Sequence, residues 1–284
     1  MSGPVLAVDI GGTKLAAGIV ETDGTLVEHR RIATPRGEDP EVLWNTLAGL
    51  IDGLQRIDGT IGVGVGCGGP MTAGGETVSP LNIPAWRDFP LRRRLHEHCG
   101  LPVWVDNDAK ALALGEGWVG AATGERDYIG MVVSTGVGGG IVCDGRLLDG
   151  AGGNAGHIGH VIVEPDGHEC GCGARGCVEA EASGTAISRI TGRDPADAPD
   201  DVRARCGTMV GRAIASVANL LDLQLAVVSG GVALGYGEIF FDAAQAEIDA
   251  RCQLDFSRST LVVPGALREG GPLVGAARIA FLRL

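Results

Sequence analysis

The sequence lacks the segments that would place the protein in a membrane or outside the cell. No uninterrupted apolar run approaches the ~18 residues that a membrane-spanning helix needs. Residues 1–30 do not combine a charged start with an apolar core and a cleavage site, so we expect no secretory signal. The eight cysteines are therefore expected to belong to a protein of the reducing cytoplasm.

Positive charge is also scarce. The 284 residues carry 23 Lys and Arg against 35 Asp and Glu, a formal net charge of −12. This balance argues against a nucleic-acid partner, but not against a phosphorylated ligand, because backbone N–H groups bind phosphate without a basic patch. With 45% hydrophobic and 20% charged residues, the chain has the composition of a globular protein with one large core or two modest ones.

Glycine is the residue type in excess: 48 of 284 residues, about 17% against a usual ~7%. The glycines follow no Gly-X-Y period, and Ser and Gln tracts are few, which excludes collagen-like and low-complexity chains. Glycine inside apolar segments instead predicts tight turns where the backbone comes close to a neighbour or a ligand.

Two parts of the chain share one pattern: strand, glycine turn, strand, Asp-Gly turn and strand. Each predicts a three-strand meander. The expected strands cover 5–9, 15–20 and 25–27 in the first, and 129–133, 141–143 and 146–148 in the second. We interpret the repeat as a structural duplication, in which two related halves face each other and place a glycine turn on either side of a cleft.

Helix and strand signals alternate along the rest of the chain, which predicts an α/β fold with mainly parallel crossovers. Asp39-Pro40 is typical of a helix start. Further helices are expected at 109–118 and 210–221, strands at 61–66, 101–105 and 225–229, and a surface loop at 193–201. With a hinge near residue 118, the expected domains are 1–117 plus about 270–284, and 118–269.

The first glycine turn, Asp9-Ile-Gly-Gly-Thr-Lys14, offers backbone N–H groups, a hydroxyl and a carboxylate at a strand end. Such a turn can bind phosphate while Asp9 orients Mg²⁺ through its waters, although a plain hairpin with a structural Asp has the same sequence. The second turn, Ser134–Gly140, favours the phosphate role, because two such turns can hold one nucleotide. A strand follows it, which excludes a P-loop and a Rossmann site. Gly230-Gly231 is placed to serve the adenosine.

Asp108 follows a strand and opens a helix, with Asn107 beside it. An Asp at a helix start commonly caps the helix, and this is the simpler interpretation. The alternative is a general base at the mouth of a cleft, with Asn107 binding a hydroxyl.

The segment Cys170-Gly-Cys172-Gly-Ala-Arg-Gly-Cys177 has the spacing of a zinc knuckle. A fourth ligand is available upstream from His157, His160 or His168. Three thiolates and one imidazole would leave no open position, so the zinc would be structural and would set the position of Glu179. The remaining cysteines are expected to be small core residues: Cys67, Cys99, Cys143, Cys206 and Cys252.

These motifs together resemble the ROK family of repressors, open reading frames and kinases. The matching segments, in order, are Asp9–Lys14, Asn107-Asp108, Ser134–Gly140, Gly156-x-x-Gly-His160 and Cys170-x-Cys-Gly-x-x-Gly-Cys177-x-Glu179. The resemblance covers nearly the whole chain. It implies an actin-like, hexokinase-like α/β fold of two domains, and a glucokinase-like sugar kinase that uses ATP, Mg²⁺ and a structural Zn²⁺.

The resemblance also implies roles for single residues. Asp108 is expected to be the catalytic base, acting on the 6-OH of a hexose. The expected nucleotide-site residues are Asp9, Gly11, Gly12, Thr13, Lys14, Thr135, Gly136, Gly138, Gly230 and Gly231. The expected sugar ligands are Gly68, Asn82, Asn107, His157, His160 and Glu179. The expected zinc ligands are His160, Cys170, Cys172 and Cys177.

His157 departs from the family pattern, because sugar-phosphorylating members usually carry a glutamate at this position. The change replaces an anionic acceptor with a group that can also donate, which leaves the identity of the sugar open. Glucose, N-acetylmannosamine, N-acetylglucosamine and other hexoses all remain candidates.

Other members of the family are transcriptional repressors with a winged helix-turn-helix ahead of the sugar-binding body. The first expected strand starts near residue 4, so we expect no such module and no nucleic-acid or membrane partner. A sugar-sensing protein without catalysis is the alternative, although it does not account for the Asn107-Asp108 pair. We expect a homodimer or homotetramer whose small-molecule partners are a sugar and ATP.

Overall fold

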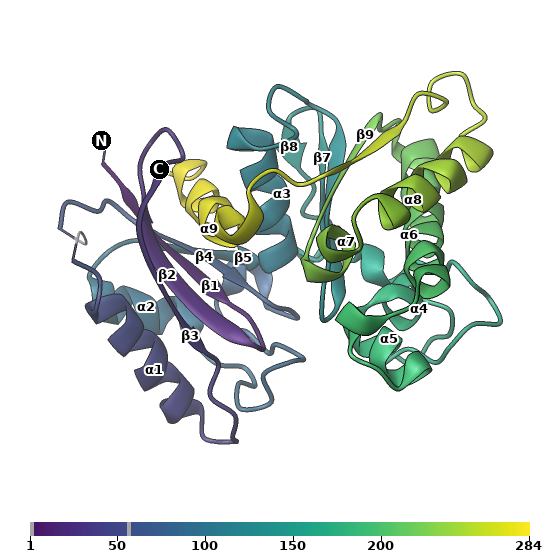
Figure 1. The fold of residues 1–284 in the computed structure, drawn as a ribbon. Coiled ribbons are helices and arrows are strands. Elements are labelled where there is room, and N and C mark those ends of the chain that lie inside the picture. The colour runs from purple at the N-terminus through teal and green to yellow at the C-terminus, as the bar shows by residue number, and fades with distance from the viewer. Residues whose placement is uncertain (1–2, 56–57) are drawn as a thin grey trace. The chain divides into compact units, whose positions relative to one another are not determined.

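The computed structural model describes residues 3–55 and 58–284, and its chain divides into two compact units (Figure 1). The first unit comprises Met1–Val119, Asp149–Ala155 and Glu269–Leu284. The second comprises Gly120–Leu148 and Gly156–Arg268. The segment Asp149–Ala155, which the sequence pattern assigns to the second domain, thus groups with the first unit.

The first unit is built on a five-stranded sheet with the order β3-β2-β1-β4-β5. Its first three strands form the expected antiparallel meander, and β4 and β5 extend the sheet in parallel from β1. The strands are β1 (Val5–Ile10), β2 (Lys14–Val20), β3 (Leu26–Ala33), β4 (Val63–Cys67) and β5 (Val103–Asn107).

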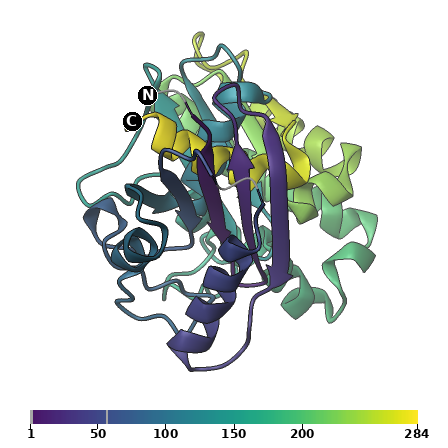
Figure 2. The same ribbon diagram turned by 90° about the vertical axis from the view of Figure 1, so that its left-hand side faces the viewer.

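Helices cover both faces of this sheet. One face packs on α1 (Pro40–Asp52) and α2 (Leu91–Cys99), and the Asp39 carboxylate caps α1 as the sequence predicts. The other face carries α3 (Asp108–Val119) and α9 (Gly271–Phe281). Figure 2 shows α9, in yellow, running across the strands of the first unit. A short 3₁₀ turn, η1 (Ala73–Gly75), lies beside β5.

The second unit repeats this sheet. Its order is β10-β9-β6-β7-β8, so an antiparallel meander is again extended by two parallel strands, which confirms the predicted structural duplication. The strands are β6 (Tyr128–Val133), β7 (Val137–Cys143), β8 (Arg146–Leu147), β9 (Leu225–Ser229) and β10 (Leu261–Pro264).

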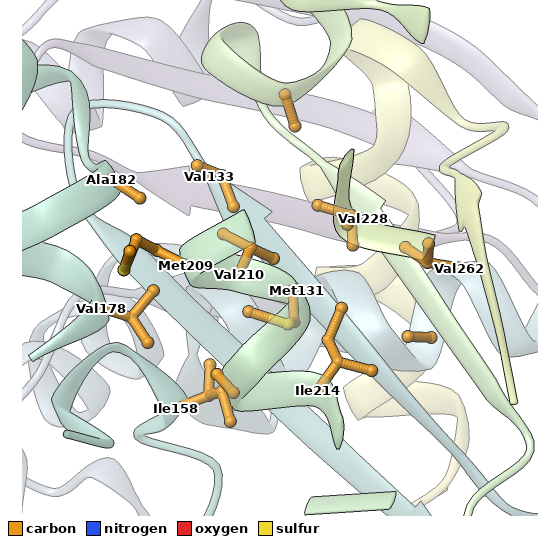
Figure 3. Close-up of a cluster of buried hydrophobic side chains, with 14 of the residues drawn as sticks. Met131, Val133, Ile158, Val178, Ala182, Met209, Val210, Ile214, Val228 and Val262 are labelled. Atoms are coloured by element: carbon orange, nitrogen blue, oxygen red, sulfur yellow. The ribbon is translucent and has the colours of Figure 1, made fainter. Parts of the chain in front are cut away.

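The core of the second unit lies between this sheet and its helices. Figure 3 shows Met131 of the sheet among Ile158, Val210 and Ile214, all of them buried. The helices are α4 (Val178–Ala182), α5 (Gly184–Thr191), α6 (Asp200–Leu221), α7 (Gly231–Tyr236) and α8 (Glu238–Arg251). The unit also contains two short 3₁₀ turns, η2 (Ile158–His160) and η3 (Pro195–Asp197), and a third, η4 (Arg268–Gly270), spans its boundary with the first unit.

Three details differ from the sequence expectation. β7 begins at Val137, so the second glycine turn is shorter than Ser134–Gly140 and its last glycines lie within a strand. The segment 193–201 is not all loop, because it contains η3 and the start of α6. Of the five cysteines expected in the core, Cys99 and Cys143 are only half-buried. Over the residues that the structure describes, no helix is both long and apolar enough to cross a membrane.

Candidate functional site

The first glycine turn joins β1 to β2 and keeps its backbone accessible. Gly11 N–H donates to the carbonyl of Lys14 at 3.0 Å, and the Thr34 hydroxyl donates to the carbonyl of Gly11 at 2.6 Å. A Cβ at Gly12 would lie 2.6 Å from the Cβ of Asn82, so only glycine allows this approach. The structure thereby brings Asn82, a predicted sugar ligand, against a residue predicted to contact phosphate.

Two predicted acidic groups lie at the ends of β1 and β5, two strands of the first unit that are separated by β4. In the sheet register, Ile10 of β1 pairs with Cys67 of β4, and Cys67 pairs with Asn107 of β5. Asp9 is buried next to this edge, and Asp108 follows it directly. Parallel strands end at the same edge of a sheet, so the topology gathers these residues although almost 100 positions separate them in the sequence.

The charges of the two carboxylates act on each other. Burial is the main cause that raises the pKa of Asp9 to about 7; the Asp108 carboxylate raises it further and Lys14 opposes the shift. Burial also raises the pKa of the Cys67 thiol, with Asp108 and Asp9 adding to the effect. Both carboxylates thus act on the same edge of the sheet, and a cation bound there would stabilise their charged forms.

Asn107, and not Asp108, caps α3. Its Oδ1 accepts from Ala109 N–H at 3.0 Å and from Lys110 N–H at 3.3 Å. Asp108 is the first residue of the helix, and its Oδ1 accepts the N–H of the adjacent Ala109 at 2.9 Å. The simpler interpretation of Asp108 as a helix cap is thus wrong, since the neighbouring amide fills that role.

In the second unit, a pocket of about 450 Å³ adjoins the other glycine turn. It is lined by Thr135 from the turn, by Gly231 at the start of α7, and by Thr185 and Tyr236. Gly230 has a φ of 103°, and a Cβ there would lie 2.3 Å from the carbonyl oxygen of Val133. Only glycine therefore lets α7 begin this close to the end of β6.

The pocket unites two motifs that the sequence places almost 100 residues apart, and it adds residues that sequence reasoning missed. The missed residues come from α5 and from the segment before α6: Gly184, Thr185, Ser188, Asp194, Pro195 and Ala196. The Asp- and Pro-rich composition of 193–201 was a visible signal, but nothing local connects it to Thr135. Gly138 lies within β7, paired with Val132, and is not among the residues that line the pocket.

Four predicted metal ligands converge: His160, Cys170, Cys172 and Cys177. Their ligand atoms all lie within 4.8 Å of one another. The Sγ atoms of Cys172 and Cys177 are 3.8 Å apart, and Cys170 Sγ lies 3.7 Å from Nδ1 of His160. A tetrahedral ion with Zn–S of about 2.3 Å and Zn–N of about 2.0 Å would have edges of roughly 3.8 and 3.6 Å. The donor set and its dimensions therefore fit a closed four-coordinate metal site.

The other two histidines considered for this site lie elsewhere. His168 Nδ1 is 3.0 Å from Oε2 of the buried Glu181, so its ring contacts a carboxylate. The ring of His157 lies 6.2 Å from that of His160, centroid to centroid, and His157 is not among the convergent ligand atoms. Of the three candidates, the structure places His160 at the cysteines.

Glu179 connects the metal loop with the second glycine turn. It belongs to α4, which starts directly after Cys177, and its Oε2 accepts from Val137 N–H at 3.0 Å. The same oxygen lies 2.8 Å from where a Cβ at Gly136 would be. A metal in the loop would therefore fix the base of α4 and, through it, the carboxylate of Glu179.

The fold and these sites together define a class of protein: a duplicated α/β fold with a glycine turn in each unit and a Cys₃His metal loop. The chain belongs to the ROK family, which it matches over residues 5–282. It is 39% identical over 250 residues to the N-acetylmannosamine kinase of Citrobacter koseri. The aligned region covers 82% of this chain and 84% of that protein.

Two solved structures share the fold over almost the full chain. The ROK family glucokinase from Streptomyces griseus, solved with glucose and AMPPNP, has a TM-score of 0.84 at 32% identity and covers 97% of this chain and 98% of that one. The ROK hexokinase from Thermus thermophilus has a TM-score of 0.83 at 34% identity and covers 99% and 98%. The predicted actin-like α/β fold is confirmed.

The raised pKa of Asp9 predicts that the free energy of unfolding depends on pH. Between about pH 4 and pH 7 the folded chain keeps a proton on Asp9 that the unfolded chain releases, so the stability contributed by this group falls as pH rises through that window. Asp9→Asn has no such proton to lose. The difference in unfolding free energy between Asp9→Asn and wild type should therefore grow by about 2–3 kcal/mol in favour of the variant from pH 5 to pH 8. Urea titrations at several pH values measure this difference.

Asp23→Asn is the matched control for this test, because Asp23 is exposed and its pKa is lowered by hydrogen bonds from Thr25. The control should show no such gain. Parallel pH profiles for Asp9→Asn and wild type would contradict the buried-charge interpretation.

Proposed function

We propose that the protein is an ATP-dependent sugar kinase that transfers the γ-phosphoryl group of ATP to a hydroxyl of a hexose or N-acetylhexosamine. The observation that carries the proposal is the pair of carboxylates, Asp9 and Asp108, which lie at the ends of β1 and β5 on one edge of the sheet, beside a glycine turn. Asp108 does not cap α3, because Asn107 does, and its carboxylate can accept a proton. The kinase activities of the similar proteins agree with this assignment.

Asp108 is the proposed catalytic base. It would take the proton from the attacking hydroxyl, which we propose to be the 6-OH of a hexose. Because Oδ1 of Asn107 faces the helix start, the NH₂ of that amide is the half of the side chain that can donate to a sugar hydroxyl. Asn82 and Gly68 are the further sugar-binding residues proposed in the first unit.

The glycine turns are the proposed phosphate-binding elements. In the first unit, Gly12, Thr13 and Lys14 would bind through backbone N–H groups, a hydroxyl and an ammonium, and Gly11, whose N–H donates to the carbonyl of Lys14, would shape the turn around the phosphate. In the second, Thr135 and Gly136 would bind phosphate, while Gly230 and Gly231 at the 450 Å³ pocket would receive the adenosine. Mg²⁺ bound with ATP neutralises phosphate charge, and the Asp9 carboxylate would hold it through its waters.

In the second unit, the proposed sugar ligands are Glu179, His157 and His160. The Nδ1 of His160 faces the cysteines, which leaves its Nε2 for a sugar hydroxyl. One oxygen of Glu179 accepts from Val137, so the other is the acceptor proposed for the sugar. We further propose that the metal in the loop is structural zinc, since three thiolates and an imidazole leave no ligand position open.

We expect one zinc per chain in protein purified without chelators, measured by mass spectrometry of the metal. Cys172→Ser should lower the content several-fold, because a hydroxyl replaces a thiolate ligand. Cys99→Ser, at a half-buried thiol outside the cluster, should retain the metal. Zinc-free wild-type protein, or equal zinc in both variants, would refute the assignment.

The decisive substitution for the mechanism is Asp108→Asn. The variant should fold normally, since Asn107 caps α3. It removes the proposed base, so kcat should fall by roughly 10²–10⁴-fold while the KM for sugar and for ATP changes far less. The readout is sugar-dependent ADP release across a panel of hexoses, with the melting temperature measured on the same preparation.

Asp52→Asn, at an exposed aspartate paired with His98, should keep wild-type turnover. Near-wild-type kcat in a folded Asp108→Asn would remove Asp108 from the mechanism. A wild-type protein that binds sugars and never releases ADP would instead be a sugar sensor.

His157→Glu is expected to change the preference among sugars. The substitution exchanges a group that can donate for one that only accepts, and a mismatched polar contact in a binding site is worth about 1–3 kcal/mol. The ratios of kcat/KM among glucose, N-acetylmannosamine and N-acetylglucosamine should therefore shift by roughly 5- to 100-fold. Unchanged ratios would show that His157 does not contact the substrate.

A further inference from the structure

Lysine is rare in this chain: only two of the 23 Lys and Arg residues are lysines, Lys14 and Lys110. Lys14 is exposed in the first glycine turn. Lys110 is different, because its side chain on α3 is only 2% exposed. A cation buried to this extent is stable only with partners for its charge and for each of its N–H groups.

Three oxygen atoms surround the Lys110 ammonium. Nζ lies 2.9 Å from Oδ1 of Asp106 and 2.9 Å from Oδ1 of Asp149, and it donates to the carbonyl of Gly153 at 3.3 Å. An ammonium has three donors on a compact point charge, which matches this arrangement, whereas the planar fork of arginine does not. The lysine therefore joins two parts of the first unit that lie more than 40 residues apart.

One of these parts is the carboxyl end of β5. The Oδ1 of Asp106 that contacts Lys110 also accepts the backbone N–H of Asn107 at 2.8 Å. The position of Asn107, and of Asp108 after it, thus depends on a carboxylate whose charge Lys110 balances.

The other part is the loop Asp149–Ala155. It closes on itself, since Ala155 N–H donates to the carbonyl of Asp149 at 2.9 Å. Lys110 holds this loop through one side chain and one carbonyl. The chain then continues through Gly156 into His157 and η2, which carries His160.

We propose that Lys110 is a positioning residue that ties the loop Asp149–Ala155 to the carboxyl end of β5, and so sets the position of Asn107 and Asp108. The proposal rests on the proposed function for its kinetic consequences. The tie itself can be measured without any activity.

Amine labelling measures the tie directly, because the chain has only two lysine side chains. In native protein treated with N-hydroxysuccinimidyl acetate, peptide mass spectrometry should show rapid acetylation of Lys14 and at least 100-fold slower acetylation of Lys110. Asp149→Ala removes one partner of the Lys110 ammonium, and because the Asp149 side chain is 53% exposed, the variant should fold. We expect it to speed acetylation of Lys110 at least 10-fold, with Lys14 as the internal reference.

Kinetics then separate positioning from a merely structural role. Asp149→Ala should raise the KM for sugar about 3- to 10-fold and leave the KM for ATP unchanged. Lys110→Met also frees Asp106, so it should lower kcat at least 10-fold. Adding Asp149→Ala to Lys110→Met should cause no further loss, because the tie is already gone. Asp52→Ala, at an exposed ion pair with His98, is the matched control and should match wild type.

The outcomes distinguish this proposal from the proposed function. Wild-type Lys110 labelling and wild-type sugar KM in Asp149→Ala would overturn the tie, even if Lys110→Met did not fold. Lower melting temperatures with unchanged kinetic constants would make Lys110 structural and would also overturn it. A wild-type protein that phosphorylates no sugar would overturn the proposed function, and the labelling rate alone would then decide whether the tie exists.

Discussion

The parallel pairing of β1, β4 and β5 is the constraint on which the first unit depends. It sets Ile10, Cys67 and Asn107 in one row, and the residues next to that row carry the chemistry. Burial raises the pKa of Asp9 to about 7 and the nearby Asp108 carboxylate raises it further, so a cation bound at this edge would stabilise the charged form of both groups. The pairing also orders the start of α3, where Asn107 takes the capping role and leaves Asp108 available.

In the second unit, the short helix α4 is the element that connects the candidate site residues. Glu179 and Glu181 stand two positions apart on it and point to different partners: Val137 N–H for the first, His168 and Arg205 for the second. The helix starts directly after Cys177. Its five residues therefore connect the metal loop with the glycine turn and with α6. Through this connection, a metal bound by His160 and the three cysteines would hold residues that are proposed to bind substrate.

Local signals in the sequence were sufficient for much of this architecture. The meanders, the Asp39 cap and the cysteine spacing depend on residues close together in the chain, and the structure has all of them. The pocket beside Thr135 was missed because its walls come from α5, η3 and α7, which only tertiary packing brings together. The cap at α3 was assigned to the wrong residue because Asn and Asp are nearly equal caps, and only the geometry decides between adjacent ones.

Lys110 was unremarkable in the sequence for a related reason. One cationic residue on a helix face is usually solvated, and nothing near it in the chain predicts that Asp149 and Gly153 approach it. The roles of His157 and Glu179 toward a sugar rest on the family pattern, which physical reasoning from single residues does not supply.

The place of α9 affects the order in which the protein can assemble during synthesis. Its side chains Leu273, Ala276, Ala277 and Ala280 pack on Val5, Ala7, Ala16 and Val20, so the first strands made are covered by a helix made after the whole second unit. A nascent chain that ends before α9 exposes an apolar sheet face, whereas the second unit already has every strand and helix of its own. In the order of synthesis, the sequence of the second unit is therefore complete before the helix that closes the first unit has been made.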